Sequence, residues 1–544
     1  MSQPAKSWSM ARVITASSAG TAFEWYDFFI FGSLTPVIAK VFLAGLEPTG
    51  ALVAALALFA VGFAFRPLGA IIFGAMGDRV GRKATFLATV SLMGIATFAI
   101  GLLPTYEQVG ILAPVLLVIL RIAQGTALGG EYGGAAIYVA EHAPDHKRGE
   151  ATGWIQSSAS FGLLAALLII FATRTALGED AFAVWGWRIP FLVSILLLGI
   201  SVWMRLKLSE SPQFAKLKEE GATSKAPLTE SFANRESLKR VLIAFFGIMC
   251  AQGAVWYFTF FYLQVFLEKS LGLPGATKDM LLIVMTLISA PLYVYFGWLS
   301  DRIGRKPVML GGMLLALALY FPGSHLIAQA TNPALVAAQA QTPVVIETDP
   351  ATCTSQFDPT GTAKFTSACD LAKSTLIARG VAYSTRASGD GQTKVVAGPQ
   401  SVPVASGEGV ADLKAHKAGI ATAINAELAE TGYPTSADPK AVHMVLLLSV
   451  LLGFVVAATA LYGPQAAALV EMFPTRIRYT AMSLPYHVGT GWVGGFLPVT
   501  SFAIVAATGD IYAGLWYAVV FTAISAVVTI FFVKETRGKR LEEV

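Results

Sequence analysis

Twelve apolar stretches, each about as long as a bilayer-crossing helix, dominate this chain of 544 residues. A helix needs about 20 mainly apolar residues to cross the hydrocarbon core. Backbone groups in lipid must be satisfied within the segment, so we expect helices. The stretches lie near residues 13–39, 51–75, 84–104, 111–140, 151–173, 185–206, 240–267, 279–299, 307–329, 441–466, 480–506 and 511–533. Since one soluble core cannot bury twelve of them, we predict an all-α membrane protein.

Composition and missing motifs exclude several other classes. Only 13% of the residues are charged and 55% are hydrophobic, which is atypical of disordered chains, ordinary soluble enzymes and nucleic-acid binders. The sequence has no GxxxxGK[ST], HExxH or GxSxG motif, so we expect no nucleotide site, catalytic residues, metal or cofactor. Glu24 and Asp27 in the first stretch are atypical of a cleavable signal peptide.

The distribution of Lys and Arg predicts the orientation. These residues gather before the first stretch, after the even-numbered stretches and in the carboxyl-terminal tail. Because short cytoplasmic loops carry an excess of positive charge, we expect both termini to be cytoplasmic. A long segment between the ninth and tenth stretches would then be extracytoplasmic.

The chain contains an internal repeat. Residues 73–83 and 296–306 share seven identical positions at a spacing of 223 residues. A second set recurs 330 residues later, as Glu141, Pro144 and Arg148 followed by Glu471, Pro474 and Arg478. We therefore predict two six-helix halves in parallel repeat. The change in spacing indicates an insertion of about 107 residues between the ninth and tenth helices.

These boundaries predict six segments: 1–206, a six-helix bundle; 207–239, a cytoplasmic linker; 240–329, helices 7–9; 330–440, the insertion; 441–533, helices 10–12; and 534–544, a cytoplasmic tail. The insertion has β-rich pieces at 343–347 and 393–397 and a helical pattern near 409–431, which suggests a small αβ unit. Cys353 and Cys369 would form a disulfide worth about 3 kcal/mol in an oxidising compartment; free thiols are the alternative. Whether the insertion gates access, binds a partner or only decorates the bundle stays open.

Six motifs together resemble a known family. The repeated Gly-x-x-x-Asp-Arg-x-Gly-Arg-Lys resembles the loop signature of the major facilitator superfamily. Residues 23–28, 65–69, 121–134, 210–214 and 473–478 resemble its metabolite:proton symporter family, which includes permeases for α-ketoglutarate, citrate, shikimate, proline and betaine. The resemblance covers residues 13–329 and 441–540. It implies twelve transmembrane helices in two pseudo-symmetric bundles, in a bacterial cytoplasmic (inner) membrane.

Five charged residues are clear cases of charge inside the apolar stretches: Glu24, Asp27, Arg66, Arg121 and Glu131. Charges in lipid are costly and usually face a cavity or one another. Glu24 and Asp27 share a helix face, and helical rise places them at the depth of Arg121. We hypothesise that Asp27 or Glu24 carries a proton with Arg121 as switch partner, and that Glu131 on the same stripe contributes. A static buried ion pair is the alternative.

The substrate-binding candidates are Tyr26, Arg66, Arg121, Gln124, Tyr132, Tyr257, Gln264 and Tyr486. The planar fork of Arg66 suits a carboxylate, but Arg66 would equally serve to brace its helix against Glu131. For His487 we favour a structural hydrogen bond over a proton role. The gating candidates are Gly74, Asp78, Arg79, Arg82, Glu141, Arg148, Asp301, Arg302, Arg305, Glu471 and Arg478. An Asp at one helix end can meet the positive end of another helix.

These patterns predict a secondary transporter that imports a small organic acid or zwitterionic metabolite with protons, by alternating access. Its partners would be that substrate, protons and the lipid bilayer, with no nucleic acid or nucleotide. Two alternatives are a facilitator or exchanger without proton coupling, and a transporter-derived sensor whose outer domain binds ligand.

Overall fold

The computed structural model of this chain describes residues 10–44, 55, 58–207, 210–354 and 365–541. Ten helices within that part are long and apolar enough to cross a membrane. Two more helices fall outside this group: α1, which carries Arg12, Glu24 and Asp27, and the apolar α24 of 17 residues. The predicted start of the second stretch at residue 51, and parts of the predicted linker, insertion and tail, lie outside the described residues.

The first half of the chain contributes the helices that begin the bundle. They are α1 (Met10–Ser33), α2 (Thr35–Phe42), α4 (Arg66–Arg79), α5 (Arg82–Leu102), the short α6 (Tyr106–Val109), α7 (Leu112–His142), α8 (Arg148–Leu177), the short α9 (Glu179–Ala181) and α10 (Arg188–Leu206). The stretch predicted as one helix at 13–39 is two helices, because the backbone leaves helical geometry at Leu34.

The second half follows three short helices, α11 (Pro212–Glu219), α12 (Pro227–Phe232) and α13 (Arg235–Ala244). It contains α14 (Cys250–Tyr257), α15 (Leu263–Val265), α16 (Gly275–Ile303), α17 (Arg305–Thr331), α21 (Met444–Val470), α22 (Arg478–Val488), α23 (Leu497–Thr508) and α24 (Leu515–Phe531). The π-helical turns η3 (Phe245–Met249), η4 (Phe258–Tyr262) and η5 (Phe266–Ser270) interrupt the seventh predicted helix, and η7 (Gly489–Gly494) separates α22 from α23.

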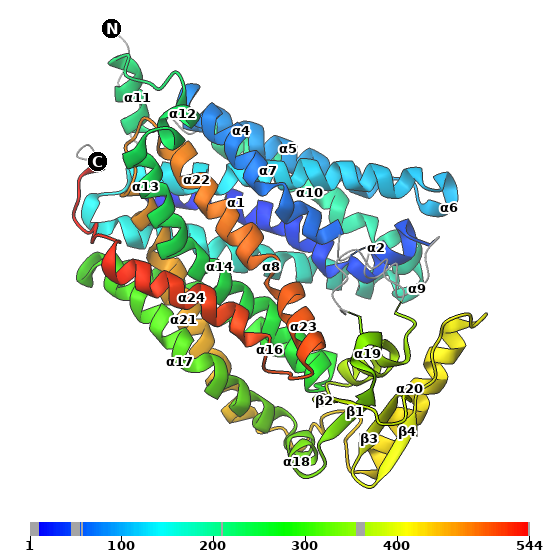
Figure 1. Cartoon of the computed structure of the whole chain (residues 1–544). Coiled ribbons are helices and arrows are strands. Elements are labelled where there is room, and N and C mark those ends of the chain that lie inside the picture. The colour runs from blue at the N-terminus through cyan, green and yellow to red at the C-terminus, as the bar shows by residue number, and fades with distance from the viewer. Residues whose placement is uncertain (1–9, 45–54, 56–57, 208–209, 355–364, 542–544) are drawn as a thin grey trace.

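The two halves pack against each other along α8 with α16 and α4 with α22 (Figure 1). The α8–α16 contact brings backbones together, since a Cβ on Gly297 would lie 2.3 Å from the carbonyl oxygen of Gly149. Small residues at such positions let helices approach closely where lipid supplies no hydrophobic drive between them. The interface is therefore built on backbone proximity.

The insertion forms a small αβ unit. Its elements are α18 (Pro333–Gln341), β1 (Val344–Thr348), α19 (Ala368–Ala378), β2 (Tyr383–Ala387), β3 (Lys394–Ala397), β4 (Gln400–Pro403) and α20 (Leu413–Glu430). The strand order is β2-β1-β3-β4, with β1 and β2 parallel and the other pairs antiparallel. The parallel pair requires a crossover, which α19 supplies. Ile346 and Val395 pair in register on the buried side of the sheet, and Cys353 is disulfide-bonded to Cys369.

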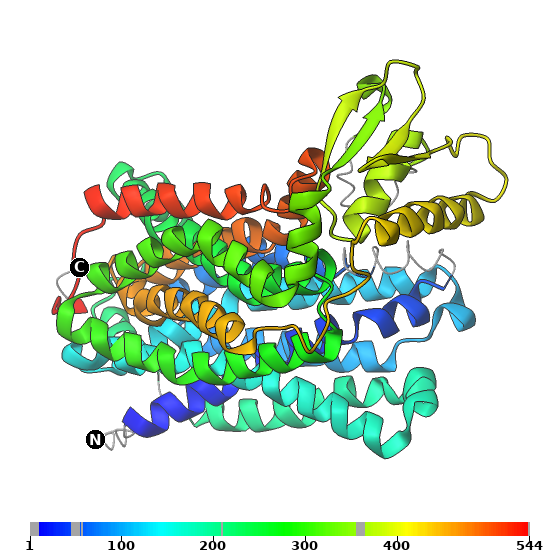
Figure 2. The same ribbon diagram turned by 90° about the horizontal axis from the view of Figure 1, so that it is seen from below.

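The insertion docks on the second half, at the end of the bundle opposite the start of α1 and the end of α24 (Figures 1 and 2). Asn332 donates its side-chain amide to the carbonyl of Leu271 at 3.0 Å, and the backbone of Tyr383 donates to Gly509 at 2.9 Å. His443 donates its backbone N–H to the carbonyl of Ala330 at 2.8 Å. The chain therefore enters and leaves the insertion at neighbouring points.

Candidate functional site

Asp78 ties the end of α4 to the second half. Its carboxylate accepts hydrogen bonds from the backbone N–H groups of Tyr479 (3.2 Å) and Thr480 (2.8 Å) in the first turn of α22. An acid at a helix amino terminus satisfies free donors and meets the positive end of the helix dipole. Arg82 pairs with Asp78 at 2.9 Å and donates to the carbonyl of Thr475 at 2.7 Å. Asp78 and Arg82 are fully buried.

Asp301 makes the equivalent contact in the opposite direction. It ends α16 of the second half and accepts from the backbone N–H groups of Gly149 (2.9 Å) and Glu150 (2.8 Å) in the first turn of α8. Arg305 pairs with Asp301 as Arg82 pairs with Asp78. The sequence repeat thus becomes a pair of reciprocal helix caps between the halves.

Two further acids extend these caps into a network. Glu141 accepts from Arg478 at 2.7 Å, and Glu471 accepts from Arg148 at 2.7 Å and Arg305 at 3.1 Å. We call this the interhalf network; its members are Asp78, Arg82, Glu141, Arg148, Asp301, Arg305, Glu471 and Arg478. Eight of the eleven gating candidates therefore lie together.

The other three gating candidates lie beside the network. Gly74 leaves room for α22, because a Cβ there would lie 3.0 Å from the Cα of Thr480. Arg79 donates to the carbonyl of Lys225 at 2.7 Å, and the guanidinium of Arg302 lies 4.0 Å from the ring of Trp298. Both arginines are at the helix ends, outside the buried network.

A second charged cluster lies inside the first half. Arg205 of α10 pairs with Glu24 of α1 at 2.9 Å and with Glu131 of α7 at 2.8 Å. Thr89 donates to the other oxygen of Glu131 at 3.0 Å. We call Arg205, Glu24 and Glu131 the charge triad; each is at most 2% exposed. Arg205 is missing from the predicted site. Its position inside the apolar stretch 185–206 could have identified it as a buried charge.

In the described structure Arg121 forms no ion pair with Glu24 or Asp27, although one of these two acids was expected to be its switch partner. Its guanidinium donates to the carbonyls of Leu58 (3.3 Å) and Phe59 (3.1 Å) and to Gln124 (2.8 Å). Along α7, Arg121 and Glu131 are ten residues apart, about 15 Å by helical rise. Helical rise predicted that Arg121 shares the depth of Glu24, but the residue of α7 that shares a partner with Glu24 is Glu131, about 15 Å further along the helix.

Asp27 lies between Arg121 and the charge triad. Gln124 links Arg121 to the hydroxyl of Thr97, to which it donates at 2.7 Å, and Thr97 lies beside Asp27. One carboxylate oxygen of Asp27 is buried and has no hydrogen-bond partner. Polar side chains thus connect Arg121 to the acids through the interior of the first half.

Arg66 is a buried cation without an acid partner among the described residues. It is 1% exposed, and its Nε and one terminal nitrogen have no hydrogen-bond partner. Its guanidinium lies over the rings of Phe63 (4.6 Å), Phe28 (5.1 Å) and Trp25 (5.8 Å). Glu131, which it might have braced, is held by Arg205 instead. Arg66 therefore has free donors for an anion.

Three predicted aromatic residues gather near Arg66, where the halves meet. Tyr132 of the first half stacks on Tyr486 of the second, with ring centroids 3.7 Å apart. Tyr257 contacts Phe63 edge-on at 5.6 Å and lies beside Arg66. His487 is buried nearby, and neither of its ring nitrogens has a hydrogen-bond partner. The hydrogen bond that we favoured for His487 is therefore missing from the described structure.

Two other predicted substrate residues point elsewhere. Tyr26 donates its hydroxyl to the carbonyl of Pro190 at 2.8 Å, which turns it toward α10. Gln264 is half-buried and donates to the carbonyl of Phe260 in its own helix. Neither contacts the group around Arg66 in any described interaction.

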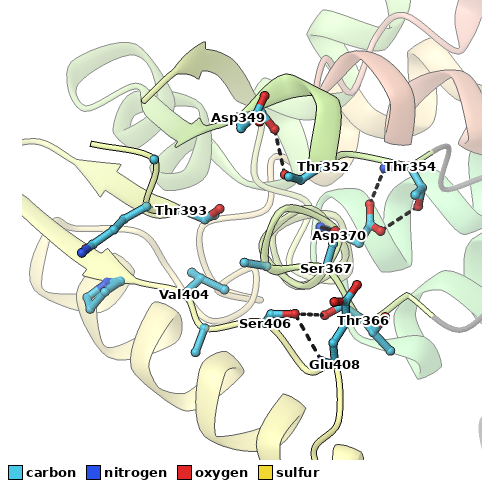
Figure 3. A pocket seen from close by; sticks show the side chains of 15 residues that line it. Asp349, Thr352, Thr354, Thr366, Ser367, Asp370, Thr393, Val404, Ser406 and Glu408 are labelled. Carbon is cyan, nitrogen blue, oxygen red and sulfur yellow. Dashed lines mark hydrogen bonds between the residues drawn. The ribbon is translucent and has the colours of Figure 1, made fainter. Parts of the chain in front are cut away.

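The insertion contains a separate cavity of about 780 Å³, between α19 and the loops that carry Thr393 and Ser406 (Figure 3). Its wall is rich in hydroxyl and carboxylate groups. Asp370 is satisfied by the backbone N–H and hydroxyl of Thr354, at 2.9 and 2.6 Å. No described wall residue has a buried polar side-chain atom without a partner. We therefore place the candidate site in the bundle, at Arg66.

Two family models match this chain, one in each part of it. Residues 18–345 match the family model described as Major Facilitator Superfamily, and residues 416–544 match Sugar (and other) transporter. The proline/betaine transporter of Escherichia coli (strain K12) is 37% identical over 327 residues, which are 58% of this chain and 65% of that protein. The shikimate transporter of the same strain is 36% identical over 314 residues, 57% of this chain and 71% of that protein.

A solved structure agrees on the fold. The proton:xylose symporter XylE bound to 6-bromo-6-deoxy-D-glucose has a TM-score of 0.64 at 16% identity, covering 98% of both chains.

The match to the glycine betaine/proline/ectoine/pipecolic acid transporter OusA of Dickeya dadantii (strain 3937), at 36% identity, spans 58% of this chain and 65% of that protein. The chain therefore matches just under two thirds of the length of OusA and of the proline/betaine transporter.

This chain belongs to the Major Facilitator Superfamily. The predicted resemblance is confirmed, because relatives include proteins named proline/betaine and shikimate transporters. The prediction of a transporter-family protein instead of an enzyme is confirmed by the same membership.

Proposed function

We propose that this protein is a secondary transporter that imports a small organic acid or a zwitterion together with protons, by alternating access. The observation that carries this proposal is Arg66, a buried guanidinium with two unpaired donors between the halves. A buried charge is stable only when paired, and a planar guanidinium suits a carboxylate. Both substrate classes carry that group.

The distribution of charge supports coupling to protons. Away from the interhalf network, the described first half buries three acids and three arginines: Glu24, Asp27, Glu131, Arg66, Arg121 and Arg205. The acids lie together around Arg205, whereas Arg66 and Arg121 lie apart from them. An anion at Arg66 and a proton on an acid would each reduce a local imbalance, so binding one favours the other. We retain Glu24, Asp27, Arg121 and Glu131 as proton-coupling residues.

The interhalf network supports alternating access. Its contacts are ion pairs and helix caps at one end of the bundle, and such contacts can break without unpacking an apolar core. We propose that it is the cytoplasmic gate, closed in this structure. The substrate would enter from the opposite end and leave when Asp78 and Asp301 release α22 and α8.

We further propose the topology that the sequence predicts. Together with α1 and α24, the ten long apolar helices give twelve spans of a bacterial inner-membrane protein, with both termini in the cytoplasm. The insertion is then extracytoplasmic, an oxidising location that suits its disulfide. The domain boundaries proposed above, with helices 7–9 and 10–12 on either side of the insertion, follow from this topology.

Uptake into proteoliposomes tests the proposal. Purified protein would be reconstituted and offered labelled glycine betaine, proline, shikimate and citrate, with and without an imposed inward proton gradient. We expect the gradient to raise accumulation of at least one probe tenfold or more, and an uncoupler to abolish that increase. Equal accumulation with and without the gradient would favour a facilitator, and no uptake of any probe would contradict carboxylate transport.

A further inference from the structure

Outside the interhalf network, Arg205 is the only arginine in the described structure that pairs with a buried acid of the first half. It reaches from the last turn of α10 to Glu24 and Glu131, which belong to two other helices. Its side chain also lies over the ring of Phe86 at 3.5 Å. A Cβ on Gly20 would lie 2.5 Å from its terminal nitrogen, so α1 leaves it just enough space. The fold thus holds this guanidinium in one place.

The charges around Arg205 do not balance when every acid is ionised. One guanidinium faces two carboxylates, and one oxygen of Glu24 is buried without a partner. Asp27, one helical turn further along α1, adds a third carboxylate with an unpartnered oxygen. An uncompensated buried charge is strongly unfavourable, and protonation removes it. The cluster is therefore built to hold a proton.

The same cluster touches the interhalf network through Tyr479. This residue of α22 donates its hydroxyl to the carbonyl of Gly130 at 2.6 Å, directly before Glu131 in α7. Its backbone N–H is one of the two groups that Asp78 caps. If α22 moves away from α7, Tyr479 leaves and the side of the triad facing α22 becomes accessible to water.

We propose that Arg205 positions the proton-coupling acids and makes their protonation control the gate, an inference that rests on the transport function proposed above. The titratable groups facing Arg205 are Glu24 of α1, Glu131 of α7 and Tyr479 of α22, and Asp27 of α1 faces Glu24. Water on the outer side supplies a proton, which forms an O–H bond on the free oxygen of Glu24. Glu131 stays ionised on Arg205, and the proton returns to cytoplasmic water when Tyr479 moves away.

Transport in two modes tests this role. The variants are R205Q and R205K, with K207Q as the control because Lys207 is exposed two residues further on. R205Q is expected to lose gradient-driven accumulation at least tenfold while exchange of preloaded probe stays within twofold of wild type. R205K keeps the charge but loses the planar fork, so its gradient-driven accumulation should lie between that of R205Q and that of wild type. Gradient-driven accumulation by R205Q equal to that by K207Q would overturn the proposal.

A second readout needs no substrate. Ser483 of α22 is buried against Gly133 of α7, so a cysteine there reports gate opening by its reaction with a maleimide. In an S483C/C250A background, labelling is divided by that of the unfolded protein at the same pH, because a maleimide reacts with the thiolate. This ratio should rise at least threefold from pH 8 to pH 5.5. With R205Q added it should change less than 1.5-fold. An unchanged pH profile in R205Q would overturn the role of Arg205, even if no probe is transported and the transport proposal itself fails.

If R205Q does not fold, the double variant R205Q/E131Q is used instead of R205Q in both assays. The double variant removes one charge of each sign. We expect exchange without gradient-driven accumulation, and labelling that is insensitive to pH. Recovery of both gradient-driven accumulation and the wild-type labelling profile in the double variant would show that Arg205 only balances charge, and would overturn the proposal.

Discussion

Among single residues, the buried arginines differ in whether their guanidinium groups have partners. Arg121 donates to carbonyls and Arg205 pairs with two acids, although the Nε of Arg205 has no partner; Arg66 has two nitrogens without a partner and no acid beside it in the described structure. Burying an unpaired charge costs several kcal/mol, and stability alone gives no reason to retain it. Arg66 is therefore the residue whose removal should separate binding from folding.

Replacing Arg66 with Met should remove substrate binding without lowering stability. We expect the probe concentration for half-maximal uptake to rise at least tenfold, about 1.4 kcal/mol, because a charge-assisted hydrogen bond is lost. The melting temperature in detergent should stay the same or rise. R235M, at an exposed position on α13, is the matched control. Unchanged half-maximal concentration in R66M would exclude Arg66 from the site.

Asp27 provides a second test at this scale. D27N keeps the size and polarity of the side chain but holds no exchangeable charge. We expect a folded protein that still exchanges probe but loses gradient-driven accumulation at least tenfold. D279N, at an exposed position in the second turn of α16, is the control. Accumulation at the wild-type level would reject Asp27 as a proton carrier and leave Glu24 as the candidate.

For whole helices, the charged contacts between the halves are made at helix ends. Asp78 and Asp301 each cap the first turn of a helix in the other half. A charged cap interacts with the helix dipole only within that first turn. Because this stabilisation falls off within a turn, a small outward movement of α22 or α8 breaks it, which suits a gate.

The variant D78N tests the gating role of this contact. Asparagine can still accept one hydrogen bond, but the charge on the α22 dipole and the ion pair with Arg82 are lost. We expect the inward-open or an immobile state to accumulate, with exchange at least fivefold slower. E236Q, an exposed change on α13, should exchange as wild type does. A wild-type exchange rate in D78N would rule out this role.

Gly81 links α4 to α5 with a φ of +132°, a conformation that favours glycine. A Cβ there would lie 2.3 Å from the carboxylate of Glu210, which accepts from the backbone of Arg82 at 3.1 Å. G81A should destabilise the protein by about 1–3 kcal/mol, seen as a lower melting temperature. G199A is the control, since a Cβ at Gly199 meets nothing within 4 Å. Equal melting temperatures would contradict this strain.

At the scale of the whole molecule, the insertion is attached to the second half alone among the described contacts. It lies on η5 and α23, where a cavity of about 280 Å³ separates it from the bundle. It would therefore move with the outer end of the second half during alternation. Its two ends meet at Ala330 and His443, so the bundle does not need it to close the chain.

Removing the insertion tests this independence. Replacing residues 333–441 with a short Gly-Ser linker should leave the bundle folded, because the hydrogen bond from His443 to Ala330 shows that the remaining ends are adjacent. We expect proton-driven uptake within threefold of wild type. A loss of more than tenfold, with the protein still folded by size-exclusion chromatography, would show that the insertion takes part in transport.

Much of the architecture was predictable because a membrane-spanning helix requires a long apolar run, which is visible in the sequence. The apolar stretches, the repeat at residues 73–83 and 296–306 and the family membership all follow from linear patterns. The π-helical turns in the seventh helix and the break at Leu34 were missed. Both are local departures inside apolar runs, and an apolar run carries no signal for them.

The amino-acid sequence by itself determined the long apolar helices, the repeat, and several of the charged side chains that are buried among those helices. Only the tertiary structure decided which of those charges form pairs. Arg121 donates to backbone carbonyls, Arg205 pairs with Glu24 and Glu131, and Arg66 has two nitrogens without a hydrogen-bond partner. The physical reason is that hydropathy sets depth along one axis, whereas pairing depends on how each helix rotates and packs against its neighbours.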